Sequence, residues 1–482
     1  MAMRITQSTL FSRALFDMQR GLFRYSQLQT EVATGRRVNR PSDDPAAALQ
    51  IMPLRGELRD LEQFTKNVSL ARETLNTSAA SLEDGSSVMQ RVRELATQAA
   101  NGTLSGSDRE SISAEVDQLL DQMLGIANSR RGERYLFGGT ETGSQPFTLE
   151  TVGGRTRAVY NGNGQSLEVD VAPGVNTGIN VPGDAIFLTR DRGATTFSAA
   201  PGSQSTGVAS FGSGDTGIGF GELQVSFAGL SNLPDGITAA PGSNTALGEL
   251  SYVFTPTPGG PPGAGTLSIE GGPPQSVPTP PDGVQFRTAD GREISLAVSG
   301  APTPDSGSFT AEANLSTDGG LTSVTVDSFG TGPVAVRNSE DGSMLYLNVN
   351  NMDRTGTEDV KFNGTFDVFT TLAELRDVLA NGDGFDDGYV RDRVGSLLEE
   401  IDGSHNSVLD GLRELGFRSS SMDVLQNRVE GMRVSRTESL SRIEDTDIAE
   451  SILQLQRQDL SYQTALQVSA RVLQTSLQGF LR

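Results

Sequence analysis

The two ends of the chain share one pattern of apolar residues that the middle lacks. Near the N-terminus apolar side chains recur at alternating spacings of four and three, with Gln29 as a polar interruption, at Phe11, Leu15, Met18, Leu22, Tyr25 and Val32. The C-terminal positions follow the same rule, with Asp459, Ser469 and Ser476 as interruptions, at Ile448, Ile452, Leu455, Tyr462, Leu466, Leu473 and Phe480. An average spacing of about 3.5 residues is typical of a coiled-coil seam. The pattern predicts terminal helices that work by assembly.

The rest of the N-terminal third is also predicted to be helical. Gly35 suits the left-handed end of the first helix, and Asp44 with Pro45 suits the N-cap and first position of a second. Apolar periodicity then extends to Asn101, with a kink or restart expected at Pro53 and Gly56. The sequence from Ser107 to Glu110 has the form of a capping box and predicts a third helix.

The period changes from helical to β-like after about residue 140. Residues alternate from Thr156 to Val171, and Asn161-Gly162 predicts the turn of a β-hairpin there. Short apolar runs between Gly, Pro and Ser clusters then predict an inserted β-rich domain, with runs at Leu223–Phe227, Leu267–Ile269, Ile294–Val298, Val324–Val326 and Met344–Val349. The segment from Pro256 to Pro281 is expected to be poorly ordered, because it offers little apolar surface to bury.

Proline placement separates this domain from the C-terminal third. Fifteen of the 21 prolines lie between Pro201 and Pro333, and none follows. Because proline interrupts helices, the remaining chain is free to be helical, and helical periodicity runs from Leu372 to Ile443. Asp447 then predicts the N-cap of a last helix, with Glu450 at its third position.

The fold expected from these segments is α+β, an elongated rod of paired N- and C-terminal coiled-coil helices with a β-hairpin region and an inserted β-rich domain. Residues 1–40 and 446–482 are the predicted halves of an inner coiled-coil tube domain. Residues 41–190, with the hairpin, and 356–445 are the predicted halves of a helical rod domain. Residues 191–355 form the predicted outer domain.

Composition excludes several classes of function. Cysteine is absent, which excludes disulfides and thiolate chemistry and suits a protein exported unfolded. The net charge of −22 argues against a nucleic-acid partner. No apolar stretch approaches 18 residues, so we expect no membrane insertion, and the first residues do not resemble a cleaved signal peptide.

Motifs that could carry chemistry are better explained by local structure. Gly212–Gly217 has dinucleotide-loop spacing but lies in a Gly/Ser tract, which favours a flexible loop. Asn381–Gly388 resembles a calcium loop but has Phe385 where a ligand is needed, which favours a helix-capping turn. His405 is the single histidine and lies in a periodic helix. We therefore predict no catalytic residue, metal or cofactor, and no enzyme.

Four stretches resemble the bacterial flagellin family. They are Leu28–Ala46 (LQTEVATGRRVNRPSDDPA), Gln90–Gly102 (QRVRELATQAANG), Ile443–Glu450 (IEDTDIAE) and Ala470–Leu481 (ARVLQTSLQGFL). The resemblance covers about residues 4–150 and 385–482. Within the family, Arg4–Ser8, Arg40–Pro45 and Arg134–Thr140 look like the branch that joins the hook to the filament, although many of its members are shorter.

The resemblance implies a structural subunit of the extracellular flagellum, a junction adaptor between a hook-side hook-associated protein and the flagellin filament. The implied partners are further copies in a tubular helical lattice, the hook-side protein, flagellin, a small export chaperone and the flagellar type III export apparatus. The alternative within the family is a filament-forming flagellin. A third possibility, from another class, is an enzyme or adhesin displayed on the inserted domain.

Two sets of residues are candidates for assembly contacts. The first is the apolar set of the terminal helices given above, for which the plain alternative is an ordinary core. The second is a charged set that would choose the neighbouring subunit, with a solvated surface as the alternative, and consists of Arg40, Asp43, Asp44, Arg91, Arg93 and Glu94.

Overall fold

The computed structural model describes residues 7–101, 104–188, 192–212, 214–261, 263–277, 283–330, 332–382 and 384–480, with the side chains of 7–11, 14 and 472–480 outside that description. The chain divides into two compact units, each described by itself. One consists of Met1–Glu73, Glu168–Thr177 and Ser420–Arg482, and the other of Thr74–Leu167 and Gly178–Ser419.

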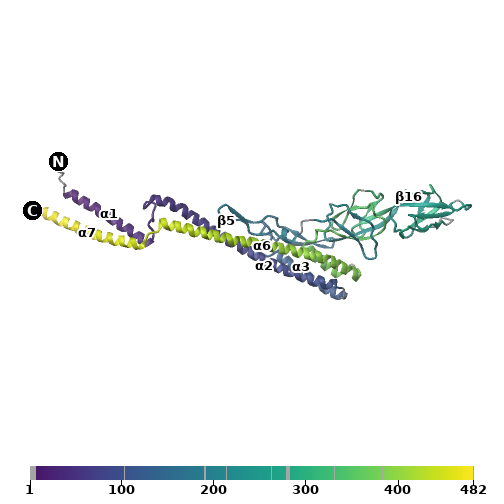
Figure 1. The fold of residues 1–482 in the computed structure, drawn as a ribbon, viewed down its shortest axis with the longest axis horizontal. Helices are drawn as coiled ribbons and strands as arrows, with labels where there is room; N and C mark the ends of the chain where they lie inside the picture. Colours follow the sequence, from purple (N-terminus) through teal and green to yellow (C-terminus); the bar gives the residue numbers. More distant parts are fainter. Residues whose placement is uncertain are drawn as a thin grey trace. The chain divides into compact units, whose positions relative to one another are not determined.

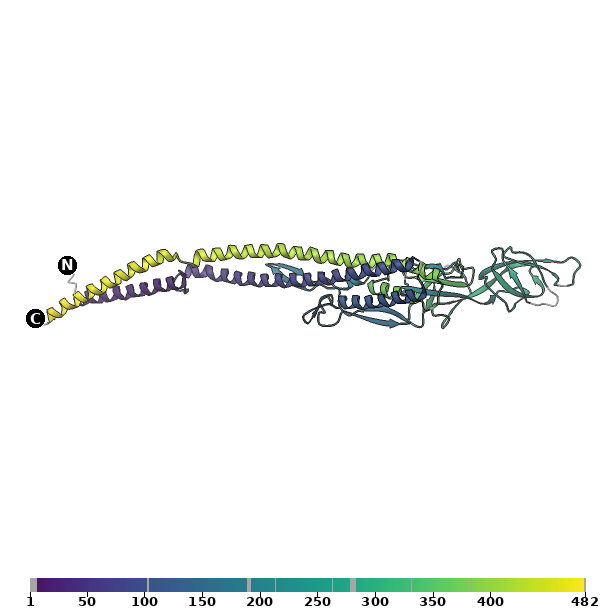
Figure 2. The ribbon, with the colours of Figure 1, turned by 90° about the horizontal axis from the view of Figure 1, so that it is seen from below.

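The helices account for both ends of the chain (Figures 1 and 2). Their bounds are α1 Gln7–Thr34, α2 Pro45–Ala100, α3 Gly106–Ala127, α4 Asp184–Phe187, α5 Val368–Ala380, α6 Asp387–Glu444 and α7 Ile448–Phe480. Helix α1 lies beside α7 in both views. Helix α2 lies beside α6 in both views, and side chains of the two helices contact each other. The first unit contains the α1–α7 pair, and helices α2 and α6 each contribute residues to both units.

Most helix ends lie where their capping residues predict. Gly35 has a φ of 69° directly after α1. The Asp44 carboxylate accepts a hydrogen bond from Ala47 N at 3.0 Å, with Pro45 as the first residue of α2. Asp447 likewise accepts from Ala449 N and Glu450 N at the start of α7. These three predictions are confirmed.

Two helix predictions differ in detail from the structure. Helix α2 continues through Pro53 and Gly56, so a restart there is wrong, and a kink stays a prediction. The carbonyl of Leu49 loses its helical donor at Pro53, but Leu49 is exposed, so water can replace that donor. The capping box of α3 is Ser105 with Asp108, two residues before the predicted pair, because both serines precede an acidic residue by three positions and pattern alone does not choose between them.

The predicted hairpin from Thr156 to Val171 is also wrong. Strand β4 (Arg155–Tyr160) pairs with the preceding strand β3 (Phe147–Val152) through a Gly153-Gly154 turn. Strand β5 (Glu168–Ala172) pairs with the following strand β6 (Val175–Gly178), so β4 and β5 do not pair with each other. Gly153 and Gly154 have φ values of 58° and 77°, which glycine adopts without strain, so this turn competes successfully with Asn161-Gly162.

The inserted β-rich domain contains antiparallel sheets. Short strands β1 (Arg130–Arg131) and β2 (Arg134–Tyr135) form a separate ladder before it. The largest sheet has the order β13-β12-β11-β16-β9-β20-β7, with β17 also paired to β16. The strands of this sheet are β7 Thr196–Ala199, β9 Phe220–Ser231, β11 Gly248–Pro256, β12 Gly265–Ile269, β13 Gln275–Ser276, β16 Ser306–Ser316, β17 Val324–Val326 and β20 Gly356–Lys361.

Two smaller sheets complete this domain. They are ordered β10-β15-β14 and β18-β19-β8. Their strands are β8 Ala209–Ser210, β10 Asp235–Ala239, β14 Gly283–Arg287, β15 Glu293–Thr303, β18 Val334–Arg337 and β19 Met344–Asn348. The five apolar runs named from the sequence fall within or overlap β9, β12, β15, β17 and β19, as predicted.

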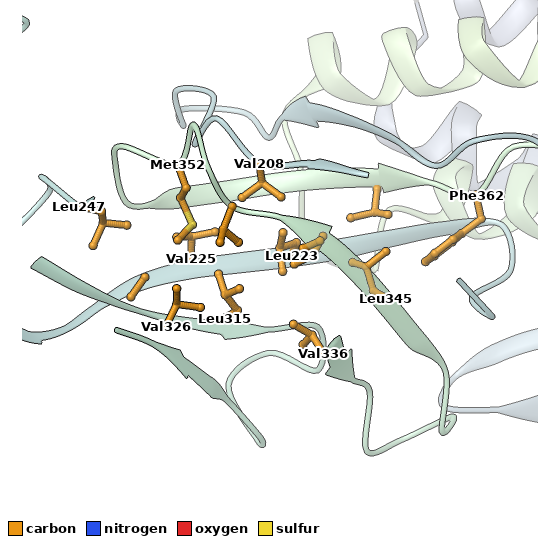
Figure 3. Packing of buried hydrophobic residues seen from close by; sticks show 14 residues of the cluster. Val208, Leu223, Val225, Leu247, Leu315, Val326, Val336, Leu345, Met352 and Phe362 are labelled. Atoms are coloured by element: carbon orange, nitrogen blue, oxygen red, sulfur yellow. The ribbon is translucent and has the colours of Figure 1, made fainter. Parts of the chain in front are cut away.

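Alternating burial along the strands creates two hydrophobic cores in the inserted domain. Figure 3 shows the first, in which Leu223 and Val225 of β9 lie among Leu315, Val336 and other buried side chains. The second includes Leu250, Phe286 and Phe309. The segment from Pro256 to Pro281 contributes strands β12 and β13, so the expectation of poor order is wrong for its described part. Leu267 and Ile269, from one of the predicted β-like runs, are fully buried and account for the order of β12, while residues 262 and 278–281 lie outside the described residues.

The fold class is confirmed, with long N- and C-terminal helices and an inserted β-rich domain. The predicted boundaries of the five segments stay predictions. No helix in the described part of the chain is long and apolar enough to cross a membrane.

Candidate assembly surface

Helices α1 and α7 contact each other through a narrow heptad interface. On α1 a set of half-buried positions recurs at spacings of three and four, at Met18, Gly21, Tyr25, Leu28 and Val32, with Gln27 and Glu31 half-buried beside it. On α7 the matching buried or half-buried positions are Ser451, Leu455, Gln458, Tyr462, Ala465 and Ser469. Gln458 Nε2 donates to the Gly21 carbonyl at 3.2 Å. A Cβ on Gly21 would lie 3.9 Å from the Tyr462 ring, so the helices approach closely at this glycine.

This interface differs by one residue per heptad from the predicted stripe. Met18, Tyr25 and Val32 lie in the interface as predicted. Gly21 takes the place of the predicted Leu22, and Leu28 takes the place of the polar interruption at Gln29. On α7 Leu455 and Tyr462 lie in it, while Ser451 and Ala465 replace Ile452 and Leu466. The small residues Gly21, Ser451 and Ala465 let the backbones approach, and the larger neighbours Leu22, Ile452 and Leu466 are exposed instead.

The displaced side chains form a second apolar stripe on each helix, here called the flanking stripe. It consists of Leu15 and Leu22 on α1, which are 36% and 49% exposed, and Ile448, Ile452 and Leu466 on α7, which are 52%, 39% and 42% exposed. Residues seven apart share a helix face, so Leu15 and Leu22 lie on one face of α1, whereas Asp459 interrupts the stripe between Ile452 and Leu466 on α7. The side chains of the predicted residues Phe11, Leu473 and Phe480 lie outside the described residues.

A third stripe, the outer stripe, faces away from the partner helix. Phe16 and Phe23 precede Met18 and Tyr25 by two residues, which is about 200° around a helix. They are 62% and 71% exposed, and their counterparts on α7, Leu453 and Leu460, are 55% and 68% exposed. An apolar surface on several sides of a helix is typical of a helix that is covered on several sides. The pair therefore offers binding surface that this chain alone leaves uncovered.

The charged residues predicted in the linker after α1 serve local structure here. Asp43 accepts hydrogen bonds from Asn39 N and Arg40 N at 3.1 and 2.8 Å. The hydrogen bond from Ala47 N, assisted by Arg37, holds the pKa of Asp44 below its usual value. The Arg40 residue itself is exposed. A role in choosing a neighbouring subunit stays a prediction for all three.

The charged residues predicted on α2 make ion pairs within the chain. Arg91 contacts Glu115 of α3 at 2.8 Å and Glu94 at 3.1 Å. Arg93 contacts Asp402 of α6 at 2.6 Å. Because these groups are largely exposed, the pairs add little stability, and the same side chains remain accessible to another molecule.

The residues with potential chemistry have structural partners. His405 Nε2 lies 2.8 Å from Ser86 Oγ, but the nearby Asp402 carboxylate is bound by Arg93, so no oriented triad forms. Burial lowers the pKa of His405, which favours the neutral ring. Asn381 ends α5 in a left-handed conformation, and Asp386 accepts from Gly388 N and Tyr389 N at the start of α6. The described residues contain no group of acidic and histidine side chains suited to a metal ion.

One connection was not anticipated from the sequence. Glu444, inside the stretch Ile443–Glu450, has a buried carboxylate bound by Arg36 and Arg55. The resemblance of this stretch to the family marks the segment as notable. The partners of Glu444 lie about 400 positions away in the sequence, so no local spacing pattern could have identified them.

Comparisons with known proteins find similarity to flagellar proteins. Residues 12–142 match the family model described as the bacterial flagellin N-terminal helical region. The chain is 29% identical over 186 residues to flagellar hook-associated protein 3 of Escherichia coli (strain K12), which covers 38% of this chain and 57% of the relative. It is 28% identical over 236 residues to the flagellar filament 41 kDa core protein of Borreliella burgdorferi, covering 47% of this chain and 68% of the relative.

Among solved structures, flagellar hook-associated protein 3 of Legionella pneumophila is 16% identical, with a TM-score of 0.46, covering 82% of this chain and 98% of that one. In the sequence comparison, the chain spans little more than half the length of the Escherichia coli relative. The resemblance to the flagellin family seen in the sequence is confirmed, and the sequence similarity includes relatives named for the hook-associated position and for the filament.

Proposed function

We propose, from the premise that this chain resembles the bacterial flagellin family and hook-associated protein 3 within it, that it is a structural junction subunit of the bacterial flagellum. It links the hook-side hook-associated protein to the flagellin filament. The observation that carries this proposal is the 29% identity over 186 residues to flagellar hook-associated protein 3 of Escherichia coli.

The uncovered apolar stripes of α1 and α7 support assembly as the mode of action. Phe16 and Phe23 on one helix, and Leu453 and Leu460 on the other, are each more than half exposed. Burying a large apolar side chain contributes roughly 1.5–3 kcal/mol, and a lattice repeats that gain in every subunit. Contacts of this kind between unlike faces of identical chains propagate into helical polymers.

Export precedes assembly in this proposal. The chain travels unfolded through the flagellar type III apparatus, aided by an export chaperone, and becomes part of the flagellum outside the cell. The absence of cysteine supports this route, because no disulfide has to be opened before passage.

A filament-forming flagellin is the second candidate, favoured by the similarity to the Borreliella burgdorferi filament core protein. Seeding purified protein onto isolated hook fragments separates the two. A junction subunit adds a short, self-limiting zone and then accepts flagellin. Growth of long filaments from this chain alone would replace the junction assignment with the filament one.

The role of the stripes is tested by introducing single carboxylates. Leu22→Asp and Leu466→Asp should prevent incorporation into flagella, since a carboxylate without a partner is costly in a packed interface. Ser461→Asp is the matched control, because Ser461 is exposed and outside all three apolar stripes. Flagella that assemble normally with either leucine variant would contradict the proposed surface.

A further inference from the structure

The two linkers of the first unit lie side by side and are hydrogen-bonded to each other. One connects α1 to α2 (residues 35–44), and the other connects α6 to α7 (residues 445–447). Arg36 forms an isolated antiparallel bridge with Asp445, and Thr446 N donates to the Gly35 carbonyl at 3.1 Å. The point where the chain leaves α1 is therefore joined directly to the point where it enters α7.

Glu444, the last residue of α6, lies at the centre of this contact. Its side chain is 3% exposed, and Oε1 lies 2.7 Å from Arg36 Nε and 2.6 Å from Arg55 Nη2. Arg55 Nε also donates to Oε2 at 3.3 Å. One buried carboxylate thus holds two guanidinium groups, one from the first linker and one from α2. Such a carboxylate is unfavourable unless both charge and hydrogen bonding are satisfied.

The backbone around Glu444 depends on the same linker. The Glu444 carbonyl accepts from Arg37 N at 2.7 Å and Val38 N at 3.4 Å, and Arg37 Nη2 donates to the Ile443 carbonyl at 3.0 Å. The last carbonyls of a helix lack partners within it, so here the linker after α1 caps the end of α6. A small core of Val38, Ala47 and Ile51 packs with Leu440 and Ile443.

Other ion pairs near the end of α6 lack this arrangement. Arg442 with Glu438 and Arg433 with Glu430 are exposed pairs within one helix. Such pairs stabilise one helix locally and connect nothing else. Glu444 differs because it is buried and joins three separate segments.

We propose that Glu444 is a positioning residue that couples the two linkers, so that α1 and α7 are held or released together. Neither terminal helix then becomes ordered independently of the other. The inference concerns the free chain and does not require the flagellar assignment.

Hydrogen exchange on the full-length Glu444→Gln variant tests the coupling. Gln keeps the shape of the side chain but loses the charge that holds Arg36 and Arg55. We expect amides in both linkers, and in α1 and α7 beyond them, to exchange roughly ten- to a hundred-fold faster, the effect of losing charge-assisted hydrogen bonds. Exchange in strand β16 of the other unit should be unchanged, which shows that the variant is folded there.

Glu438→Gln is the matched control, since it removes the same charge from an exposed pair on α6 and should change neither linker. Arg55→Met, which leaves the Arg36–Glu444 contact in place, should give a smaller but again joint increase. Hydrogen exchange on Arg55→Met tests the coupling of the two linkers if Glu444→Gln proves too unstable to measure. Faster exchange in only one linker, or in neither, would overturn the coupling.

Discussion

The terminal pair α1–α7 and the α2–α6 helices have the same kind of apolar periodicity but cover it very differently. Leu75 and Leu82 on α2, and Leu397 on α6, are fully buried within this chain. Phe23 on α1 and Leu460 on α7 are 71% and 68% exposed. Helix α2 contacts both α6 and α3, whereas among the described residues the helix packed against α1 is α7. Periodicity tells which face of a helix is apolar, and the number of neighbours decides whether one chain covers it.

Shortening a core side chain should give the largest effect on the free energy of unfolding. Leu82→Ala removes a fully buried side chain in the second unit. We expect a loss of about 2–5 kcal/mol, from lost transfer free energy and the cavity left behind. Urea unfolding followed by circular dichroism measures it. A loss below about 1 kcal/mol would mean that the α2–α6 helices are not packed more fully than the terminal pair.

A polar network in the inserted domain should give the next largest effect. The buried Asp318 carboxylate accepts hydrogen bonds from Thr322 N, Thr322 Oγ1 and Ser339 Oγ, among others. Asp318→Ala leaves these donors unpaired, and we expect a loss of about 1–3 kcal/mol. Asp318→Asn, which keeps acceptor capacity on one oxygen, should lose less.

The same carboxylate predicts acid sensitivity. Burial alone would raise the pKa of Asp318, but hydrogen bonds from Ser339, Thr322 and Ser316 hold it well below its usual range. Its contribution is therefore present above about pH 4 and is lost as the pH falls further. Acid unfolding of the wild type and of Asp318→Ala, compared between pH 5 and 2, should converge. Parallel curves would contradict the network.

Asp367 should show the opposite dependence, with an effect of at most about 3 kcal/mol. It caps α5 by accepting from Thr370 N at 2.7 Å, and burial raises its pKa to about 6. A raised pKa means that its contribution is full below pH 4 and is lost as the pH rises through 6. Asp367→Asn should flatten this part of the stability profile, measured by urea unfolding between pH 4 and 7.5. An unchanged profile would place the titration elsewhere.

The smallest effect on the free chain is expected in the terminal pair. Leu22→Ala and Leu460→Ala remove exposed apolar side chains, so the free energy of unfolding should change by no more than about 0.5 kcal/mol. The same urea titration applies, with Leu82→Ala as the reference. A loss as large as that of Leu82→Ala would show that the terminal stripes are covered within the free chain, which would remove the contrast between the two regions.

Local signals in the sequence predicted much of the fold. The ends of α1, α2 and α7 followed from Gly35, Asp44 with Pro45, and Asp447, because a cap needs only its own neighbours. The hairpin pairing did not follow, since two turns competed and the choice depended on Gly153 and Gly154 adopting positive φ. Strand β12 followed from its apolar run, but β13 did not, because Gln275 and Ser276 carry no apolar signal and are ordered by pairing with β12.

The sequence predicted that α1 and α7 have apolar heptad stripes, but not which positions of each heptad contact the partner helix. Met18, Tyr25 and Leu455 lie in the α1–α7 interface as the heptad pattern indicated. Leu22 and Leu466 lie outside it, because Gly21 and Ala465 allow a closer approach than larger side chains do. A sequence pattern ranks positions by hydrophobicity, whereas two close helices select some positions by small size. That selection depends on the partner helix and cannot be read from one helix alone.

The first and last strands of the inserted domain are paired neighbours. Strand β7 runs antiparallel to β20, with Ser198 opposite Asp359 and Thr196 opposite Lys361. About 160 residues therefore begin and end at one short ladder, so their replacement leaves the spacing of the flanking chain unchanged. Evolution can lengthen, shorten or exchange this segment without redesigning the helices that carry it. For protein engineering, the same ladder is a natural point at which to graft a foreign domain.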